Sequence, residues 1–459
     1  MEPSTPRVER DSLGELGLPD SAYYGIQTAR AIVNFPVSGR TQPAVLIRAY
    51  VLVKKAAALV NMELGVLDEP RGEAIVRAAD DVPGGGLADQ FPVDVFQAGA
   101  GTSTNMNVNE VLANRALELL GRKRGDYAYL SPNDHVNMAQ SSNDTFPTAC
   151  HLAAMLAAQP LEAALEHLSA EMRRKSEEFG SVRETGRTHL MDALPVTLGN
   201  EFGVWAGAVE RAAKRVAQRR GDLAEIPIGG TAVGTGQNVH PRFRELVVRQ
   251  LSELSGLRLF KCLDSFESLQ SRAQLAAFSG ALKELALELI RIANDLRLLG
   301  SGPVAGLGEV ILPAVQPGSS IMPGKVNPSL AECLDMVCFQ VVGNDTAVAL
   351  AAQAGQLELN VMTPVIIHNV LESEQLLVGI LPVFTDRCIA GIKADEARSR
   401  SYEALNPSLA TLLVPRIGHL AAAELAKEAL TRHVPVARLA IEKGLITESE
   451  ARALFGPDA

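Results

Sequence analysis

The chain has 459 residues, of which 47% are hydrophobic and 4% aromatic, and its formal net charge is −10. The length is enough for two or three domains or for one elongated helical assembly. Because the chain is acidic and contains no basic tract, we expect no binding to nucleic acid. The first residues lack the apolar stretch of a secretory signal, so we expect no such signal. No run of about 18 uninterrupted apolar residues occurs, so we expect no membrane span.

The cysteines are five in number, an odd count without a CxxC pair. Most of them lie in apolar stretches of helical pattern. We therefore expect reduced thiols in a cytoplasmic protein, and neither a disulfide framework nor a metal site. They are Cys150, Cys262, Cys333, Cys338 and Cys388.

The first part of the chain, residues 1–144, is mixed in pattern. Short apolar runs alternate with Pro- and Gly-rich segments such as residues 82–86. Between them, residues 44–62 have the periodicity and composition of a helix. We expect this part to form an N-terminal domain that is mixed but mostly helical.

Residues 145–393 carry apolar side chains at alternating spacings of three and four, which indicates long helices packed at shallow angles. In the helix expected around residues 282–299, a second set of apolar residues, Leu287, Ile290 and Leu298, makes the apolar surface wider than one line of contact with a neighbouring helix. A helix that is apolar on more than one face packs among several neighbours, so we expect oligomer contacts here. The seams comprise Leu161, Leu165, Leu168 and Met172; Phe202, Trp205, Val209, Ala212 and Val216; and Leu282, Leu285, Leu289, Ile292, Leu296 and Leu299.

Residues 394–459 show shorter helical patterns, broken at Pro407 and Pro415, and end in a charged, helix-like segment over residues 447–455. We expect a small C-terminal helical domain. Alanine and leucine, both strong helix formers, supply much of the apolar mass of the chain. The fold class predicted from these patterns is mainly α.

One run, residues 318–328, combines two glycines, two adjacent serines, a lysine and an asparagine. Glycine allows close backbone approach to a ligand, Lys325 supplies a point charge, and Asn327 supplies a directional donor. This is the composition of a loop that binds an anion. A Gly- and Pro-rich turn can share that composition by chance, but this run is long and ordered.

The run resembles the signature loop of the aspartase/fumarase superfamily. Five further segments resemble that family's motifs and occur in the family's order. The resemblance extends from about Tyr23 to the C-terminus, and several motifs in order are much more specific than one. The further segments are residues 99–107, 140–144, 186–189, 229–236 and 358–361.

The resemblance implies a mainly α, three-part subunit whose long central helices form the bundle of a homotetramer. It also implies active sites that each take segments from three subunits, which explains motifs scattered along the whole chain. Closed symmetric assembly is the usual outcome for such chains. The implied substrate is a small dicarboxylate, and the family chemistry requires neither a cofactor nor a metal.

The family's reaction is an anti elimination that releases fumarate from a succinyl-type substrate. By resemblance, Ser319 is the catalytic base, and backbone N–H groups of its loop stabilise the alkoxide. A turn-capping serine is the structural alternative. Ser320 is expected to donate to a substrate carboxylate, which Lys325 and Asn327 anchor. The loop is expected to close over bound substrate.

The other motifs supply the remaining contacts that the resemblance implies. Thr188 and His189 match a substrate-contacting pair, and Glu332 matches the glutamate that supports the histidine and raises its basicity. Taken singly, each short polar residue is more often a helix cap or turn residue, so they count only as a set. The expected substrate-binding residues of the first two motifs are Thr102, Ser103, Ser141, Ser142 and Asn143.

The leaving group is either ammonia or water. Residues 23–28, 99–104 and 355–362 look like aspartate ammonia-lyases, and Ala100 stands where fumarases usually carry serine. Residues 140–148 and 188–192 look like fumarases, and Ser142 stands where aspartases usually carry threonine. The amine of aspartate is already protonated and can leave as ammonia without a general acid, whereas hydroxide needs one. We favour the ammonia-lyase.

Two other classes remain as alternatives. Argininosuccinate or adenylosuccinate lyases share the signature loop but differ in the earlier motifs. A non-catalytic helical assembly with the lyase fold, as in some lens proteins, would not need Ser319, Lys325 and Asn327 together with Thr188 and His189.

Overall fold

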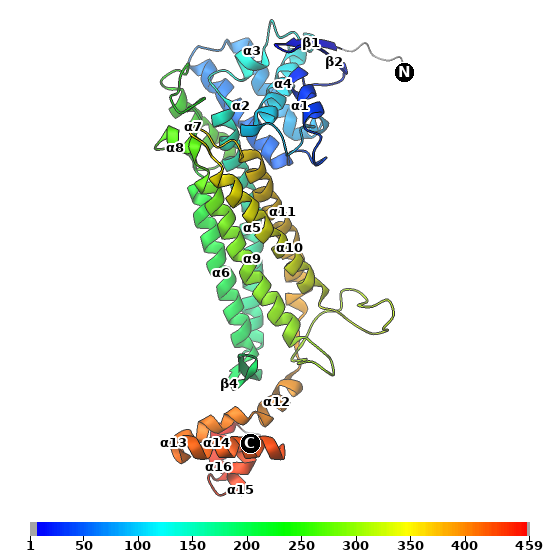
Figure 1. Cartoon of the computed structure of the whole chain (residues 1–459), viewed down its shortest axis with the longest axis vertical. Helices are drawn as coiled ribbons and strands as arrows, with labels where there is room; N and C mark the ends of the chain where they lie inside the picture. Colours follow the sequence, from blue (N-terminus) through cyan, green and yellow to red (C-terminus); the bar gives the residue numbers. More distant parts are fainter. Residues whose placement is uncertain (1–6, 457–459) are drawn as a thin grey trace. The chain divides into compact units, whose positions relative to one another are not determined.

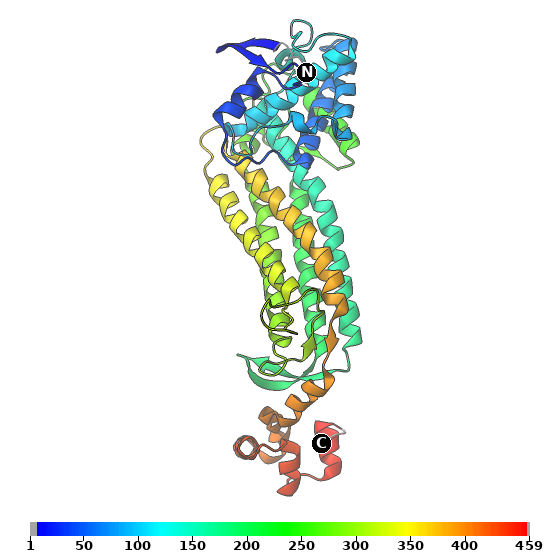
Figure 2. The ribbon, with the colours of Figure 1, turned by 90° about the vertical axis from the view of Figure 1, so that its right-hand side faces the viewer.

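The computed structural model describes residues 7–456, which divide into two compact units (Figures 1 and 2). The first unit contains the described residues up to Glu162 together with 214–286 and 339–378. The second contains 163–213, 287–338 and the described residues from Gly379 onward. The units are discontinuous because five long helices contribute residues to both. The three-part division at residues 144 and 393 stays a prediction.

The N-terminal helices of the first unit begin where the sequence supplies a helix-starting residue. Pro43 precedes the first residue of α2 (Ala44–Glu63), which confirms the helix expected over residues 44–62. The Asp68 carboxylate caps the next helix by accepting a hydrogen bond from the N–H of Arg71. The other elements here are β1 (Arg7–Asp11), β2 (Gly14–Leu18), α1 (Ile26–Asn34), α3 (Glu69–Asp81), α4 (Thr102–Leu119), α7 (Phe243–Ser255) and α8 (Ser265–Gln270), with the short parallel pair β5 (Glu225–Ile226) and β6 (Phe260–Lys261).

The long helices confirm the predicted seams. In each unit their segments run side by side in both views (Figures 1 and 2). Every predicted seam residue is buried, from Leu161 on the first of these helices to Leu299 on the third. Burial of an aliphatic side chain stabilises a fold by about 1.5–3 kcal/mol, so these seams dominate the core. The five helices are α5 (Ser142–Glu178), α6 (Leu198–Asp222), α9 (Ala273–Leu299), α10 (Ser329–Gln353) and α11 (Thr363–Arg387).

A second apolar face on these helices is exposed in the single chain. Leu287 is 51% exposed and Leu298 is 41% exposed, while the seam residues beside them on α9 are buried. Three further exposed apolar residues, Met336, Phe339 and Leu350, lie on α10. The sequence-based prediction of helices apolar on more than one face is therefore confirmed.

By length and composition, α10 is the one helix among the described residues that is apolar enough to cross a membrane, with a mean hydropathy of 1.3. A single helix of this kind is weak evidence, because core helices of soluble proteins meet the same criterion. It carries Asp335 and Asp345, which are buried and paired with Arg297 and Lys283 respectively.

The antiparallel hairpin of β3 (Arg183–Thr188) and β4 (Met191–Thr197) lies in the second unit and carries the third motif. A second short pair, β7 (Val310–Ile311) with β8 (Lys393–Ala394), joins distant segments of the same unit. The Arg187 guanidinium pairs with the fully buried carboxylate of Glu309, which anchors the strand just before the turn of the hairpin.

The C-terminal helices of the second unit have a small core of their own, built on residues such as Leu413, Leu425 and Leu439. The helix-like segment expected over residues 447–455 is confirmed, and Thr447 and Glu450 form a capping box at its start. The helices are α12 (Glu396–Leu405), α13 (Val414–Ile417), α14 (His419–Arg432), α15 (Val436–Glu442) and α16 (Glu448–Phe455).

Candidate active site

A cavity of about 620 Å³ lies in the first unit, where the first and second motifs meet. Thr102 is the first residue of α4 and Ser142 the first of α5, and their hydroxyl oxygens are 3.1 Å apart. The N-termini of two helices therefore lie side by side at the cavity, where the helix dipoles favour an anionic ligand. Ser141, Asn105 and Gln140 also line the cavity.

The backbone before Thr102 is shaped by close packing. Ala100 and Gly101 both have positive φ, at 58° and 70°. A Cβ on Gly101 would lie 2.1 Å from the ring of Phe146, so only glycine fits there. The N–H of Ala100 donates to the carbonyl oxygen of Val361 at 2.8 Å, which joins the first motif to the 358–361 motif.

Ala100 itself is 6% exposed and does not line the cavity. The sequence favours ammonia as the leaving group partly on this position, because fumarases usually carry a hydroxyl there. In this subunit the position faces the packed interior. Ser103 is likewise buried within α4 and does not line the cavity.

Asp144 holds the second motif against the glycine-rich 229–236 segment. Its carboxylate accepts hydrogen bonds from the N–H groups of Ser141 at 3.0 Å, Gly229 at 2.9 Å and Thr231 at 2.9 Å. Burial raises the pKa of Asp144 to about 6, while these hydrogen bonds oppose the rise. Asp144 lies inside the 140–144 motif. The residue type alone does not show whether such an aspartate holds the backbone or contacts a ligand.

Asn143 makes a parallel connection, because its amide Nδ2 donates to the carbonyl oxygen of Ala232 at 2.8 Å. Its backbone N–H donates to the hydroxyl of Ser141 at 3.2 Å. Two of the predicted binding residues are therefore engaged in holding the wall of the cavity together.

Thr188 and His189 lie at the tip of the β3–β4 hairpin. Thr188 pairs with Met191, so His189 and Leu190 form a two-residue turn with φ values of 56° and 59°. Positive φ at both central positions is the geometry of a type I′ turn, which usually needs Asn or Gly. Non-glycine residues in this strained conformation are concentrated at functional sites. The tip is exposed, and Leu190 is 74% exposed.

The signature loop has the local geometry that an alkoxide requires. The Ser319 hydroxyl oxygen accepts hydrogen bonds from the backbone N–H groups of Ile321 at 3.2 Å and Met322 at 3.0 Å. A turn-capping serine makes the same bonds, so this geometry is common to both interpretations. The loop is closed where Gly318 N–H donates to the Lys325 carbonyl oxygen, and Asn327 Nδ2 donates to the Gly318 carbonyl oxygen at 2.7 Å.

The remaining residues of this loop are available to a ligand. Ser320 and Lys325 are exposed. Ser319 and Lys325 line a cavity of about 440 Å³. Glu332, half-buried, lies in the first turn of α10, four residues after Pro328.

Apart from Ser103 and Asn143, which do not line the cavity, the predicted site residues fall into three groups: the cavity of the first unit, the hairpin tip, and the signature loop with Glu332. Within the second unit, no hydrogen bond or ion pair among the described residues joins His189 to Glu332 or to Ser319. Within the second unit, the hairpin tip and the signature loop are therefore separate parts of a site.

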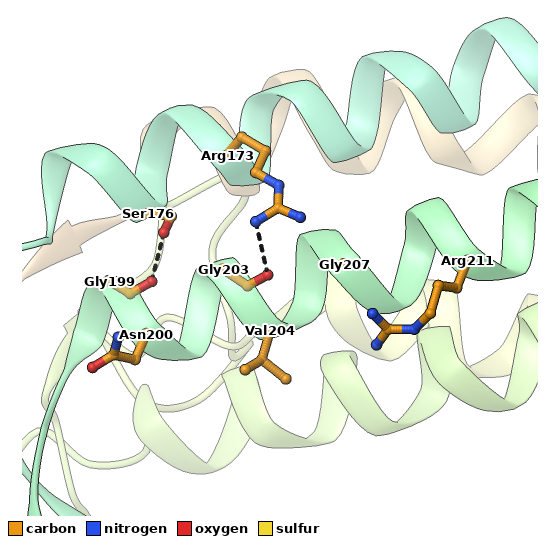
Figure 3. Close-up of a pocket in the computed structure, with 8 residues that line it drawn as sticks. All are labelled: Arg173, Ser176, Gly199, Asn200, Gly203, Val204, Gly207 and Arg211. Atoms are coloured by element: carbon orange, nitrogen blue, oxygen red, sulfur yellow. Dashed lines mark hydrogen bonds between the residues drawn. The ribbon is translucent and has the colours of Figure 1, made fainter.

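A different cavity, of about 410 Å³, contains none of the predicted site residues (Figure 3). It lies between α5 and α6 of the second unit, along a row of glycines at positions 199, 203 and 207. Arg173 closes part of it by donating to the carbonyl oxygen of Gly203 and by pairing with Glu210. In residues 7–456 no cluster of three or more His, Cys, Asp or Glu side chains is arranged to hold a metal ion.

Comparisons with known proteins place this chain among lyases. The family described as "Lyase" matches residues 14–343, and that described as "Fumarase C C-terminus" matches residues 409–459. An aspartate ammonia-lyase of Bacillus subtilis is 47% identical over 451 residues, covering 98% of this chain and 95% of that protein. A class II fumarate hydratase of Thermosynechococcus vestitus is 46% identical over 445 residues, covering 97% and 95%.

Solved structures agree with this assignment. The fumarate lyase:delta crystallin from Brucella melitensis bound to cobalt has a TM-score of 0.96 at 47% identity, covering 98% of each chain. The recombinant class II fumarase from Schistosoma mansoni has a TM-score of 0.94 at 36% identity, also covering 98% of each chain. Family match, identity and fold agree over almost the whole length, and the chain therefore belongs to the aspartase/fumarase superfamily of lyases.

Proposed function

We propose that this lyase is an aspartate ammonia-lyase, which eliminates ammonia reversibly from L-aspartate to give fumarate. The observation that carries the choice of leaving group is the lining of the 620 Å³ cavity. Its described walls contain hydroxyls, carboxamides and apolar groups but no ionisable side chain. Hydroxyl oxygens accept hydrogen bonds from an ammonium, and ammonia leaves without a general acid.

Convergence of the aspartase-like segments supports the same choice. Gln27, from the 23–28 segment, lines the same cavity as Thr102. The 99–104 and 355–362 segments are joined by the hydrogen bond from Ala100 to Val361. Segments that look like aspartases, although far apart in sequence, therefore gather in one region of the first unit.

In the proposed reaction, the Ser319 alkoxide removes the Cβ proton of aspartate. The electron pair of the broken C–H bond forms the Cα–Cβ double bond as the C–N bond breaks and ammonia leaves. Negative charge builds up on the carboxylate beside Cβ, where Lys325 and Asn327 provide charge and a donor. The N–H groups of Ile321 and Met322 stabilise the alkoxide, and His189, supported by Glu332, contacts the substrate.

The active form is proposed to be a homotetramer whose sites are each shared among three subunits. Two observations support this: within the described residues of the second unit no hydrogen bond or ion pair joins His189 to Ser319 or Glu332, and the second apolar face of α9 and α10 is exposed. An exposed apolar face of this extent is typical of an interaction surface.

The alternative is a class II fumarate hydratase, favoured by Ser142 and by relatives of that name at similar identity. The deciding experiment supplies L-aspartate and L-malate in parallel to the purified protein and follows fumarate by its ultraviolet absorbance. We expect fumarate from aspartate. Fumarate from malate alone would overturn the proposal and establish the hydratase.

A further inference from the structure

Lys54 is a fully buried lysine directly behind the cavity of the first unit. It lies in the middle of α2 with an exposed fraction of 0%. Its ammonium donates to the Asn105 Oδ1 at 2.7 Å, the Asn137 Oδ1 at 2.9 Å and the Gln140 Oε1 at 2.9 Å. All three partners line the cavity. The three N–H donors of the ammonium are thus used on neutral oxygens of the cavity wall.

These contacts connect the first and second motifs. Asn105 belongs to α4 and the first motif, whereas Asn137 and Gln140 belong to the turn that leads into Ser141. The ammonium can accept nothing, so it fixes the orientation of each amide with the oxygen toward Lys54. Thr102 and Ser142, one from each motif, are the residues whose hydroxyls meet on the cavity side.

The fixed amides in turn hold the backbone of the turn that leads into the second motif. The Gln140 Nε2 donates to the carbonyl oxygens of Val136 at 3.1 Å and Met138 at 3.0 Å. The Asn137 Nδ2 donates to the carbonyl oxygen of Gln140 at 3.2 Å. Within this turn Ala139 has φ 61°, a conformation that a non-glycine residue keeps only when its surroundings impose it.

The charge of Lys54 is not neutralised by contact, since within residues 7–456 its ammonium has no carboxylate partner. Asp144, the acid whose charge acts on Lys54, is itself held by three backbone N–H groups. Burial lowers the pKa of Lys54 to about 7, and the charge of Asp144 opposes that fall. A cation in this position favours a dianion in front of the amides over a neutral ligand.

We propose that Lys54 is a positioning residue for the elimination reaction: it holds the first and second motifs together and attracts the carboxylates of the substrate through the amides of Asn105 and Gln140. This inference rests on the proposed function only for the kind of substrate, a small dicarboxylate. A merely structural lysine would hold the fold without favouring a dianion over a monoanion.

The test compares Lys54→Met and Lys54→Gln with the matched control Lys55→Met. The glutamine variant keeps two of the donors but not the charge. Lys55 is adjacent on α2, but its ammonium pairs with Asp80 at 2.5 Å, away from the cavity. Fumarate, a dianion, and its monomethyl ester, a monoanion, are titrated into each assembled protein by calorimetry, with circular dichroism as the check on folding.

We expect both Lys54 variants to bind fumarate at least about tenfold more weakly, since each loses contacts to a charged donor, and the monomethyl ester to lose less. Lys55→Met should match the wild type. Equal loss for both ligands, unchanged fumarate affinity, or unfolding of both Lys54 variants would overturn the proposal. Fumarate is common to the ammonia-lyase and hydratase reactions, so failure of the aspartate assay leaves this test intact.

Discussion

Ser319 is the residue on which the proposed chemistry depends most directly. Its hydroxyl oxygen already accepts two backbone N–H groups, so the charge of an alkoxide would form where donors are in place. We expect Ser319→Ala to lower kcat by about 10²–10⁴-fold with little change in KM, because a positioned base contributes that much. Steady-state kinetics of fumarate formation measure the effect.

The control is Ser320→Ala, one residue further along the same loop. Within residues 7–456 no N–H group donates to the Ser320 hydroxyl. This hydroxyl is expected to donate to a substrate carboxylate, so its loss should raise KM more than it lowers kcat. If the two alanine variants had the same kinetic defect, Ser319 would not be the base.

Glu110 gives a second prediction at the scale of the residue. Glu110 is 2% exposed. Its carboxylate accepts hydrogen bonds from the N–H groups of Gly25, Gln27 and Thr28 and from the Thr28 hydroxyl. The carboxylate thereby caps the start of α1. Burial raises its pKa from 4.5 to about 7, although these bonds oppose the rise. The native state therefore holds a proton that the unfolded chain releases between these two pH values.

Because the raised pKa belongs to an acid, the stability that it contributes is present at low pH and is lost as the pH rises from about 4.5 to about 7. The free energy of unfolding should fall by about 3 kcal/mol over this range from Glu110 alone. Glu110→Gln should remove this part of the pH dependence, measured by denaturant unfolding at pH 5 and pH 8. Glu118→Gln is the control, because the pKa of Glu118 is lowered rather than raised. Equal pH dependence in the wild type and Glu110→Gln would refute the assignment.

At the scale of the element, α4 is flanked by two glycines of the same backbone conformation but different surroundings. Gly101 has φ 70°, and a Cβ added there would clash with the Phe146 ring. Gly121 has φ 71°, and a Cβ added there would meet nothing within 4 Å. Gly121→Ala should cost about 1–2 kcal/mol of unfolding free energy, from backbone strain alone. Gly101→Ala should cost about 1–3 kcal/mol more, from overpacking, and should also lower activity. Equal unfolding free energies in a denaturant titration would show that Phe146 moves aside.

The elements were more predictable than the contacts of the site. The helix over residues 44–62 and the seams on the long helices follow from periodicity, because burial of one face repeats at the helical period. Lys54 lies in that helix beside Lys55, and nothing in residue type separates the buried lysine from the one paired with Asp80. That difference arises from tertiary packing of α2 against α4 and the turn before Ser141, which one sequence does not encode locally.

The site residues show the same limit. The composition of residues 318–328 indicates an anion-binding loop, and the structure shows Ser319 in a suitable hydrogen-bonding position. The missing hydroxyl at Ala100 favours an ammonia-lyase at the level of sequence, yet this residue is buried, its N–H donates to the Val361 carbonyl oxygen, and it does not line the cavity. Side-chain chemistry is visible in a sequence, whereas the direction in which a side chain points depends on backbone dihedrals.

At the scale of the whole molecule, the proposed sharing of sites among subunits makes a quantitative prediction. Ser319→Ala damages the signature loop, and Thr102→Ala damages the cavity of the first unit. Each variant alone should be nearly inactive. After the two are unfolded together and refolded as mixed tetramers, a site that draws these parts from different subunits has one chance in four of receiving both intact. We therefore expect about a quarter of wild-type activity to return.

The control refolds each variant by itself, which should restore assembly, as judged by native mass, but no activity. Mixing Ser319→Ala with Lys325→Ala is the matched comparison, because both changes lie in one loop of one subunit. Every hybrid site then takes a loop with one defect, and activity should stay at the level of the single variants. If the mixture with Thr102→Ala also stayed inactive, the loop and the cavity would act within one subunit, and the exposed faces of α9 and α10 would need another explanation.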